Sequence, residues 1–111
     1  MTETKMAVTK SFKELVQRRV AKDAAFAENL LREGIDTMLT GDVETGKSIL
    51  RDYINATVGF AKLGEATDTS AKSLMRMFSP SGNPQARNLF GVLGYLQKQA
   101  GIELHVMPQP R

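Results

Sequence analysis

The sequence predicts a single all-helical domain in which two short helices are joined by a tight turn. Apolar residues recur at spacings of three and four along most of the chain, which is the period of an amphipathic helix. Residues suited to capping helices separate these stretches, and one short segment near the C-terminus alternates with the period of a strand. The length of 111 residues suits one compact domain.

Composition excludes several classes of protein. The chain is 41% hydrophobic and 24% charged, which is normal for a soluble globular protein. It contains no Cys, which excludes disulfides, thiolate zinc sites and thiol nucleophiles, and its single His is His105. No apolar run approaches the roughly 18 residues of a membrane span, and the first residues lack the apolar core of a secretory signal. We therefore expect a cytoplasmic protein without metal, cofactor, catalytic residues or membrane contact.

The N-terminal part is predicted to hold a disordered segment, residues 1–10, followed by a pair of helices over residues 11–41. Ser11 begins a capping-box pattern for the first helix. The apolar face of this helix comprises Phe12, Leu15, Val16 and Val20. Asp23 is expected to cap the second helix, and Gly41 to end it in a left-handed conformation. The apolar face of the second helix comprises Ala27, Leu30, Leu31, Ile35 and Met38.

A third helix is predicted to begin after Asp42, at the start of a core that spans residues 42–101. Its apolar stripe is Gly46, Ile49, Leu50, Tyr53 and Ile54. The same region, Gly41–Ser48, matches the phosphate-binding pattern G-x-x-x-x-G-K-[ST]. That mechanism requires a strand before the loop, whereas helical spacing precedes Gly41, and Asp42 and Glu44 would repel phosphates. We therefore interpret the stretch as a helix junction in which Gly46 allows close approach, and rank nucleotide binding as the least favoured function.

Three more helices are predicted in the second half of the chain. The first two cover Phe60–Thr67 and Ser70–Phe78, with a turn at Asp68. A dense loop signal at Ser79–Pro84 precedes the last helix, about Gln85–Gln99. The last helix is expected to bury Leu89, Phe90, Leu93 and Leu96.

After Gly101 the period changes to that of a half-buried strand over residues 102–107, followed by a tail of residues 108–111. The sequence offers no second strand, and a lone strand leaves its backbone amides unpaired. We therefore predict that this strand pairs with its copy in a homodimer. The residues expected in the dimer interface are Ile102, Leu104 and Val106.

The segment from Leu63 to Phe78 has the layout of a helix-turn-helix. Gly64 is small where the two helices come closest, and Asp68 tolerates the left-handed conformation that the turn requires. The wedge between the helices comprises Leu63, Leu74 and Met77. Short helix pairs also occur in proteins that bind no DNA, but the charge distribution favours DNA. The whole net charge of +3 falls in residues 59–111, and no acid lies between Ser70 and Ala100.

If the second of these helices lies in the major groove of double-stranded DNA, its outward residues face the bases. Lys72 or Arg76 would donate to guanine, and Ala71 or Met75 would meet a thymine methyl group. The complete set of expected DNA contacts is Ser70, Ala71, Lys72, Ser73, Met75, Arg76, Ser81, Asn83, Gln85 and Arg87.

The stretch from Phe60 to Val106 resembles the lambda-repressor-like helix-turn-helix regulators, and among them the addiction-module antidote (antitoxin) proteins. The matching residues of the family pattern are Ser70, Ser73, Leu74, Arg76, Gly82, Asn83 and Pro84. The chain departs from the pattern at Ala71 and Met75, where the family often has Arg and Tyr, so single base contacts do not transfer. The resemblance implies a dimeric DNA-binding protein and, in some members, one that neutralises a toxin.

The leading hypothesis is a DNA-binding transcriptional regulator of a small bacterial operon. The alternative is a partner-binding antitoxin whose N-terminal helices, Ser11 to Thr40, mask a toxin. This alternative is favoured by the balanced charge of the N-terminal half and by its extra pair of helices, which a minimal DNA-binding domain does not need.

Overall fold

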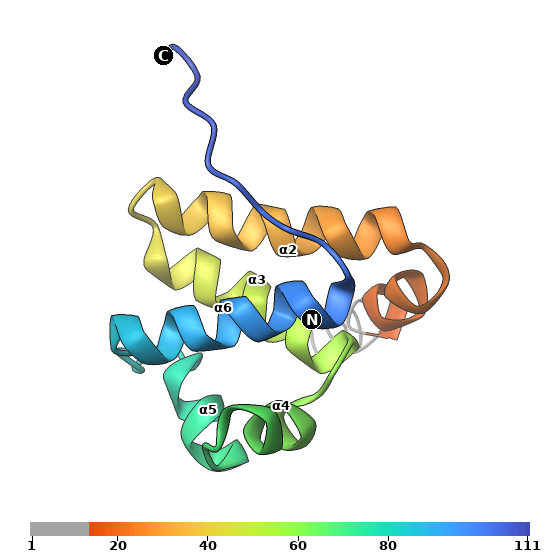
Figure 1. Cartoon of the computed structure of the whole chain (residues 1–111), viewed down its shortest axis with the longest axis vertical. Helices are drawn as coiled ribbons and strands as arrows, with labels where there is room; N and C mark the ends of the chain where they lie inside the picture. The colour runs from red at the N-terminus through yellow and green to blue at the C-terminus, as the bar shows by residue number, and fades with distance from the viewer. Residues whose placement is uncertain (1–13) are drawn as a thin grey trace, which may run out of the picture.

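The computed structural model describes residues 14–111, and the predictions for residues 1–10, Ser11 and Phe12 lie outside this range. The described chain is helical, as predicted, and contains no strand within residues 14–111. A first helix occupies residues 14–22. The others are α2 (Ala24–Leu39), α3 (Val43–Ala56), α4 (Phe60–Thr67), α5 (Ala71–Met77) and α6 (Ala86–Ala100) (Figure 1).

The caps between the early helices lie where the sequence predicts them. The N–H of Phe26 donates to Asp23 Oδ1 over 3.1 Å, and the N–H of Thr45 donates to Asp42 Oδ1 over 3.2 Å. Gly41 has a φ of +97°, a conformation that a residue with a side chain rarely adopts. Asp23 begins α2, whereas Gly41 follows its end and Asp42 begins α3, so that the two helices form an antiparallel hairpin (Figure 1).

Two glycines allow α2 and α3 to approach closely. A Cβ atom on Gly46 would collide with the Met38 side chain and lie 3.0 Å from the carbonyl oxygen of Gly34. A Cβ atom on Gly34 would lie 2.9 Å from the Leu50 side chain. The stretch Gly41–Ser48 is therefore the turn, cap and first helical turns of a tightly packed helix pair, in agreement with the junction interpretation.

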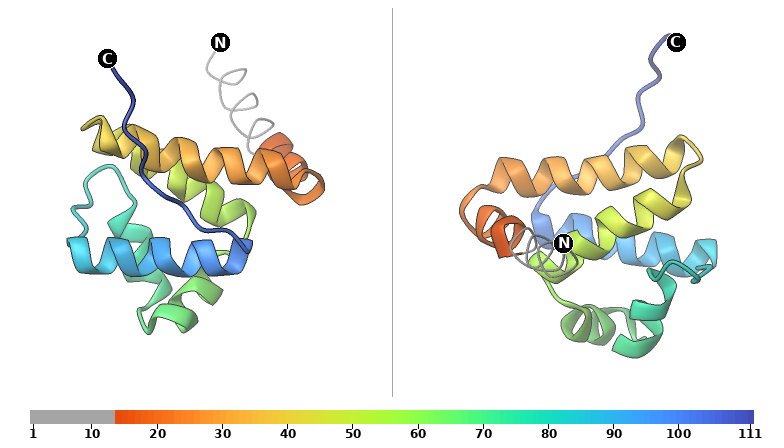
Figure 2. Two further views of the ribbon diagram at one scale, coloured as in Figure 1. Left: turned by 45° about the horizontal axis from the view of Figure 1, so that its top comes forward. Right: turned by 180° about the vertical axis from the view of Figure 1, so that it is seen from behind.

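The core lies between two helix pairs, with α6 crossing between α2–α3 on one side and α4–α5 on the other (Figures 1 and 2). Tyr53 of α3 is buried there, and desolvation raises the pKa of its hydroxyl. The other buried members of this core are Leu31, Leu50, Ile54, Phe60, Leu63, Leu74, Phe78, Val92, Leu93 and Leu96. One continuous core therefore joins the N-terminal hairpin to the helices predicted to contact DNA.

Two apolar residues expected in the core are exposed. Phe90 is 67% exposed and Leu15 is 59% exposed, so the prediction of their burial is wrong. The buried face of α6 is centred on Val92 and Leu96, and Phe90 lies about 140° away from the midpoint of these two residues at 100° per residue. In the helix of residues 14–22, Val20 faces the core. Leu15 precedes Val20 by five residues, so it lies on a different face of the helix and is exposed.

The C-terminal segment is held to the core at its start and extends away at its end (Figure 1). The N–H groups of Ile102 and Leu104 donate to the backbone and side-chain oxygens of Gln97, over 3.1 and 2.8 Å. Both side chains are half-buried against the core, whereas Val106 is 77% exposed. The strand predicted over residues 102–107 is therefore not formed by the single chain, because a strand needs a neighbouring backbone to pair with.

Replacing Gly46 with Ala is expected to lower the free energy of unfolding by about 1–3 kcal/mol, because its methyl group forces α2 and α3 apart. Gly91→Ala is the matched control: it lies inside α6, where an added Cβ meets nothing within 4 Å. This control should raise stability by about 0.5–1 kcal/mol. Urea unfolding followed by circular dichroism measures both; equal effects of the two changes would contradict the close packing.

Candidate nucleic-acid interface

The connection between α4 and α5 is a tight turn fixed by two residues. Asp68 has φ 53° and ψ 44°, the left-handed conformation that the sequence predicts for it. The carbonyl of Gly64 accepts hydrogen bonds from the backbone N–H groups of Asp68 and Thr69, the latter over 2.9 Å. A Cβ atom on Gly64 would lie 2.5 Å from the carbonyl oxygen of Thr69. A side chain at Gly64 would therefore change the angle between the helices.

Helix α5 begins at Ser70, whose side chain caps it. Ser70 Oγ accepts a hydrogen bond from the N–H of Ser73 over 3.1 Å and donates one to Ser73 Oγ over 2.8 Å. The inner face of α5 carries the buried Leu74, and Phe78 packs its ring against Phe60 with centroids 6.2 Å apart. These contacts hold a helix of seven residues against the core.

The outer face of α5 carries four of the ten residues predicted to contact DNA. Lys72, Ser73, Met75 and Arg76 are exposed. Ala71 differs from the prediction, since it is half-buried and packs against the core. It follows directly after the tight turn, so its side chain is covered by the neighbouring helix and does not join the outer face.

The loop after α5 brings a second set of predicted contacts beside the first. Ser73 and Arg76 of α5 line a shallow hollow of about 280 Å³ together with Ser81, Gly82 and Asn83. Ser81 and Asn83 are themselves exposed. Residues ten positions apart in the sequence thus form one continuous polar surface.

The last two predicted contacts lie at the start of α6. Gln85 is the N-cap residue of this helix, without a side-chain cap bond, and Arg87 lies in its first turn. Both are exposed, and neither lines the hollow. They extend the polar surface beyond the loop without belonging to its centre.

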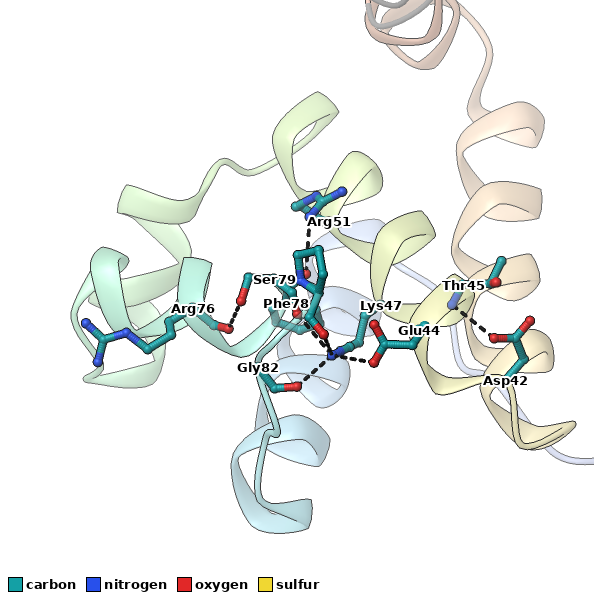
Figure 3. Close-up of polar contacts among 10 residues, drawn as sticks. Asp42, Glu44, Thr45, Lys47, Arg51, Arg76, Phe78, Ser79 and Gly82 are labelled. Atoms are coloured by element: carbon teal, nitrogen blue, oxygen red, sulfur yellow. Dashed lines mark hydrogen bonds and ion pairs between the residues drawn. The ribbon is translucent and has the colours of Figure 1, made fainter.

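Lys47 of α3 supports this surface from behind, and its role was missed by sequence reasoning. It is 2% exposed and is the one buried charged residue of the described chain. Its Nζ atom donates to the carbonyl oxygens of Gly82, Ser79 and Pro80 over 2.6, 3.0 and 3.4 Å (Figure 3). An ammonium group has three N–H donors, and the carbonyls of Gly82 and Ser79 are its two closest acceptors.

Two further contacts complete the support of the loop. Glu44, one helical turn before Lys47, places its carboxylate 3.2 Å from Nζ. Arg51, the next residue on the same face of α3, donates to the carbonyl of Phe78 over 3.4 Å (Figure 3). A hydrogen bond from a charged donor contributes about 1.5–3 kcal/mol to stability. The Lys47 ammonium makes more of these bonds to the loop than Arg51 does, so it contributes most to holding the loop.

A sequence signal for this role was present. Lys47 precedes Leu50 and Ile54 by three and seven residues, on the stripe that predicts burial. The phosphate-binding pattern predicts Lys47 as a ligand of phosphate. In the structure its hydrogen-bond partners are backbone carbonyls.

The surface formed by α5, its loop and the start of α6 carries three exposed cations, Lys72, Arg76 and Arg87. None of them takes part in the ion pairs of the described chain, which join Arg19 to Asp23, Arg32 to Glu28 and Lys47 to Glu44. Free cations on an exposed face attract a polyanion such as the phosphate backbone.

Comparison with protein-family models, curated proteins and solved structures finds no match to this chain. Within residues 14–111 no group of three or more His, Asp or Glu side chains could hold a metal ion. In the same range no helix has the length and apolar character needed to cross a membrane. The function of the chain is therefore inferred from its own geometry.

Asp68→Gly is expected to raise the free energy of unfolding by about 0.5–1 kcal/mol. Glycine avoids the cost of about 1–2 kcal/mol that an L-residue incurs in the left-handed conformation. The greater freedom of glycine in the unfolded chain lowers stability by about 0.5–1 kcal/mol. Glu65→Gly, an exposed position inside α4, is the control and should lose about 1 kcal/mol. Urea unfolding distinguishes them; a loss of stability in both variants would show that Asp68 is not held in this conformation.

Proposed function

We propose that this chain is a sequence-specific DNA-binding transcriptional regulator that uses α4 and α5 as a helix-turn-helix. The observation that carries the proposal is the outer face of α5, which exposes Lys72 and Arg76 and where Arg76 adjoins the polar loop at Ser81 and Asn83. The sequence from Ser70 to Arg87 contributes three cations, Lys72, Arg76 and Arg87, and no carboxylate to this surface. As the resemblance to lambda-repressor-like regulators implies, such a protein would control a small bacterial operon.

The chemistry of these residues fits the major groove. Arg76 has the planar, two-pronged donor that matches O6 and N7 of guanine, and Lys72 supplies a single charged donor. Met75, 53% exposed, offers an apolar contact to a thymine methyl group. The remaining contacts, to the DNA backbone or to base edges, come from Ser70, Ser73, Ser81, Asn83, Gln85 and Arg87.

We further propose that the protein binds its operator as a homodimer formed through the C-terminal segment. A groove of about 590 Å³ lies between α2, α6 and this segment. Its walls expose apolar side chains to solvent, namely Leu39, Phe90, Val106 and Met107. The extended backbone beyond Leu104 has no hydrogen-bond partner within the described chain, so a second copy could pair with it across a two-fold axis. Ile102 and Leu104 would support the interface from the core side.

A second candidate function is toxin binding by the N-terminal helices, Ser11 to Thr40. The observation that favours it is the exposure of two large apolar side chains on the described part of these helices, Leu15 and Leu39 at 59% and 63%. Co-expression with the product of the neighbouring gene, followed by purification through a tag on this chain, tests it. A 1:1 complex that Leu15→Ser and Leu39→Ser together disrupt would support toxin binding.

Arg76→Ala should weaken binding to the selected operator by about 1–3 kcal/mol if Arg76 reads a base. Duplexes are first selected from a random pool by the wild-type chain, and affinities are measured by fluorescence anisotropy at several salt concentrations. Arg18→Ala, which also removes an exposed cation but lies in the helix of residues 14–22, is the control and should leave the affinity unchanged. Absence of salt-dependent binding to any duplex by the wild-type chain would refute the proposed function.

Deleting residues 105–111 should convert the dimer to a monomer and weaken operator binding by about tenfold or more, because each half-site then binds alone. The fold should survive, since these residues are exposed and Leu104 remains in place. Analytical ultracentrifugation of both chains measures the oligomeric state. A wild-type monomer, or a truncated chain that stays dimeric, would contradict the proposed interface.

A further inference from the structure

We propose that Lys47 is a positioning residue for DNA recognition: its buried ammonium, bound to the carbonyls of Ser79, Pro80 and Gly82, fixes the loop against α5. The inference rests on the proposed function and deepens it, because it assigns part of the sequence discrimination to a residue that cannot reach DNA. Lys47 is 2% exposed and lies on α3, and its ammonium is directed at the loop that follows the helix of Arg76 (Figure 3).

The position of the ammonium is determined by its partners. Gly82 and Ser79 offer their carbonyl oxygens at 2.6 and 3.0 Å, and Pro80 follows at 3.4 Å. A buried charge is costly unless polar groups surround it, so the loop must keep these carbonyls directed at Nζ. The reverse also holds, since the carbonyls follow the end of α5 and have no helical partners. Lysine and loop therefore fix one another.

The loop in turn fixes the spacing of the groups that would meet DNA. Ser79 Oγ donates to the carbonyl of Arg76 over 2.7 Å, which joins the loop to the last turn of α5. Gly82 packs so closely that a Cβ atom there would collide with the carbonyl oxygen of Arg76 and lie 2.7 Å from that of Met77. The neighbours of Gly82, Ser81 and Asn83, share the hollow with Arg76. Displacement of the loop would change the separation of these side chains.

Helix α5 depends on this support because it is short. Seven residues make two helical turns, far below the length at which an isolated helix is stable in water. Apart from the buried Leu74 and Phe78, its C-terminal end is tied to α3 by Lys47 and by Arg51, which donates to the carbonyl of Phe78. The orientation of the proposed recognition helix is thus set partly by cations on α3.

A positioning role and a merely stabilising role predict different results. Phosphate contacts provide affinity for any duplex, whereas discrimination requires side chains placed to hydrogen-bond accuracy against base edges. Loss of positioning should therefore reduce the preference for the selected sequence and spare non-specific binding. Loss of stability alone should reduce the active fraction and weaken both kinds of binding equally.

The experiment compares Lys47→Met, which keeps an apolar stem and removes the ammonium, with Lys47→Arg, which keeps the charge and its donors. Lys22→Met removes an exposed lysine from the helix of residues 14–22 and is the matched control. The full-length chains are titrated with the duplex selected by the wild-type protein and with a scrambled duplex of equal length. Affinity for the selected duplex should fall about tenfold in Lys47→Met, the loss of roughly one base contact. Binding to the scrambled duplex should change by less than about twofold.

Lys47→Arg should recover part of the preference for the selected duplex, and Lys22→Met should keep it fully. Amide hydrogen exchange without DNA supplies an independent measurement of the loop. In Lys47→Met, exchange should accelerate about tenfold or more in α5 and residues 78–83, while α2 remains protected, as expected for local opening. Equal losses on both duplexes, or unchanged exchange, would overturn the inference.

The two proposals fail in different ways. A wild-type chain that binds no DNA refutes the proposed function and the recognition role of Lys47, whereas accelerated exchange would still establish its control of the loop. If Lys47→Met does not fold, Gly82→Ala perturbs the same loop through its contacts with Arg76 and Met77. Gly82→Ala should lose the preference for the selected duplex while Gly91→Ala keeps it. An unchanged preference in Gly82→Ala would overturn the inference.

Discussion

The arrangement of this molecule depends on a buried ammonium group that joins its two halves. Lys47 belongs to the N-terminal hairpin by sequence, yet its ammonium donates to carbonyls more than thirty residues later. A charge in a nearly water-free position is stable only where oxygen atoms surround it, so the α2–α3 pair and the loop after α5 must keep one relative position. The hydrophobic core alone would allow more freedom, because apolar contacts have no preferred direction.

Close backbone approach is the second constraint, and it acts at three places. Gly46 brings α3 against α2, Gly64 brings α4 against the turn before α5, and Gly82 brings the loop against the end of α5. In each case the nearest atoms belong partly or wholly to backbone, which cannot rotate away as a side chain can. Together with Lys47, these glycines hold the proposed recognition surface in place through contacts on the side that faces the interior of the molecule.

The molecule has two surfaces of different character, one polar and one with exposed apolar residues. The face of α5 and its loop is polar and cationic, and suits a polyanion. The groove between α2, α6 and the C-terminal segment exposes Phe90 and Val106, and suits a protein surface. A regulator that dimerises through the groove would leave the α5 face of each copy free to bind DNA.

The sequence by itself determined the local structure: helices, caps at Asp23, Asp42 and Ser70, and the left-handed turn at Asp68. These features depend on neighbours within a few positions, so periodicity and capping chemistry suffice to predict them. Only the tertiary structure decided which side of α6 faces the core, which exposed Phe90, and what Lys47 binds. Those outcomes depend on contacts between residues distant in sequence, and a hydrophobic pattern gives no information about which backbone carbonyls will surround a buried charge.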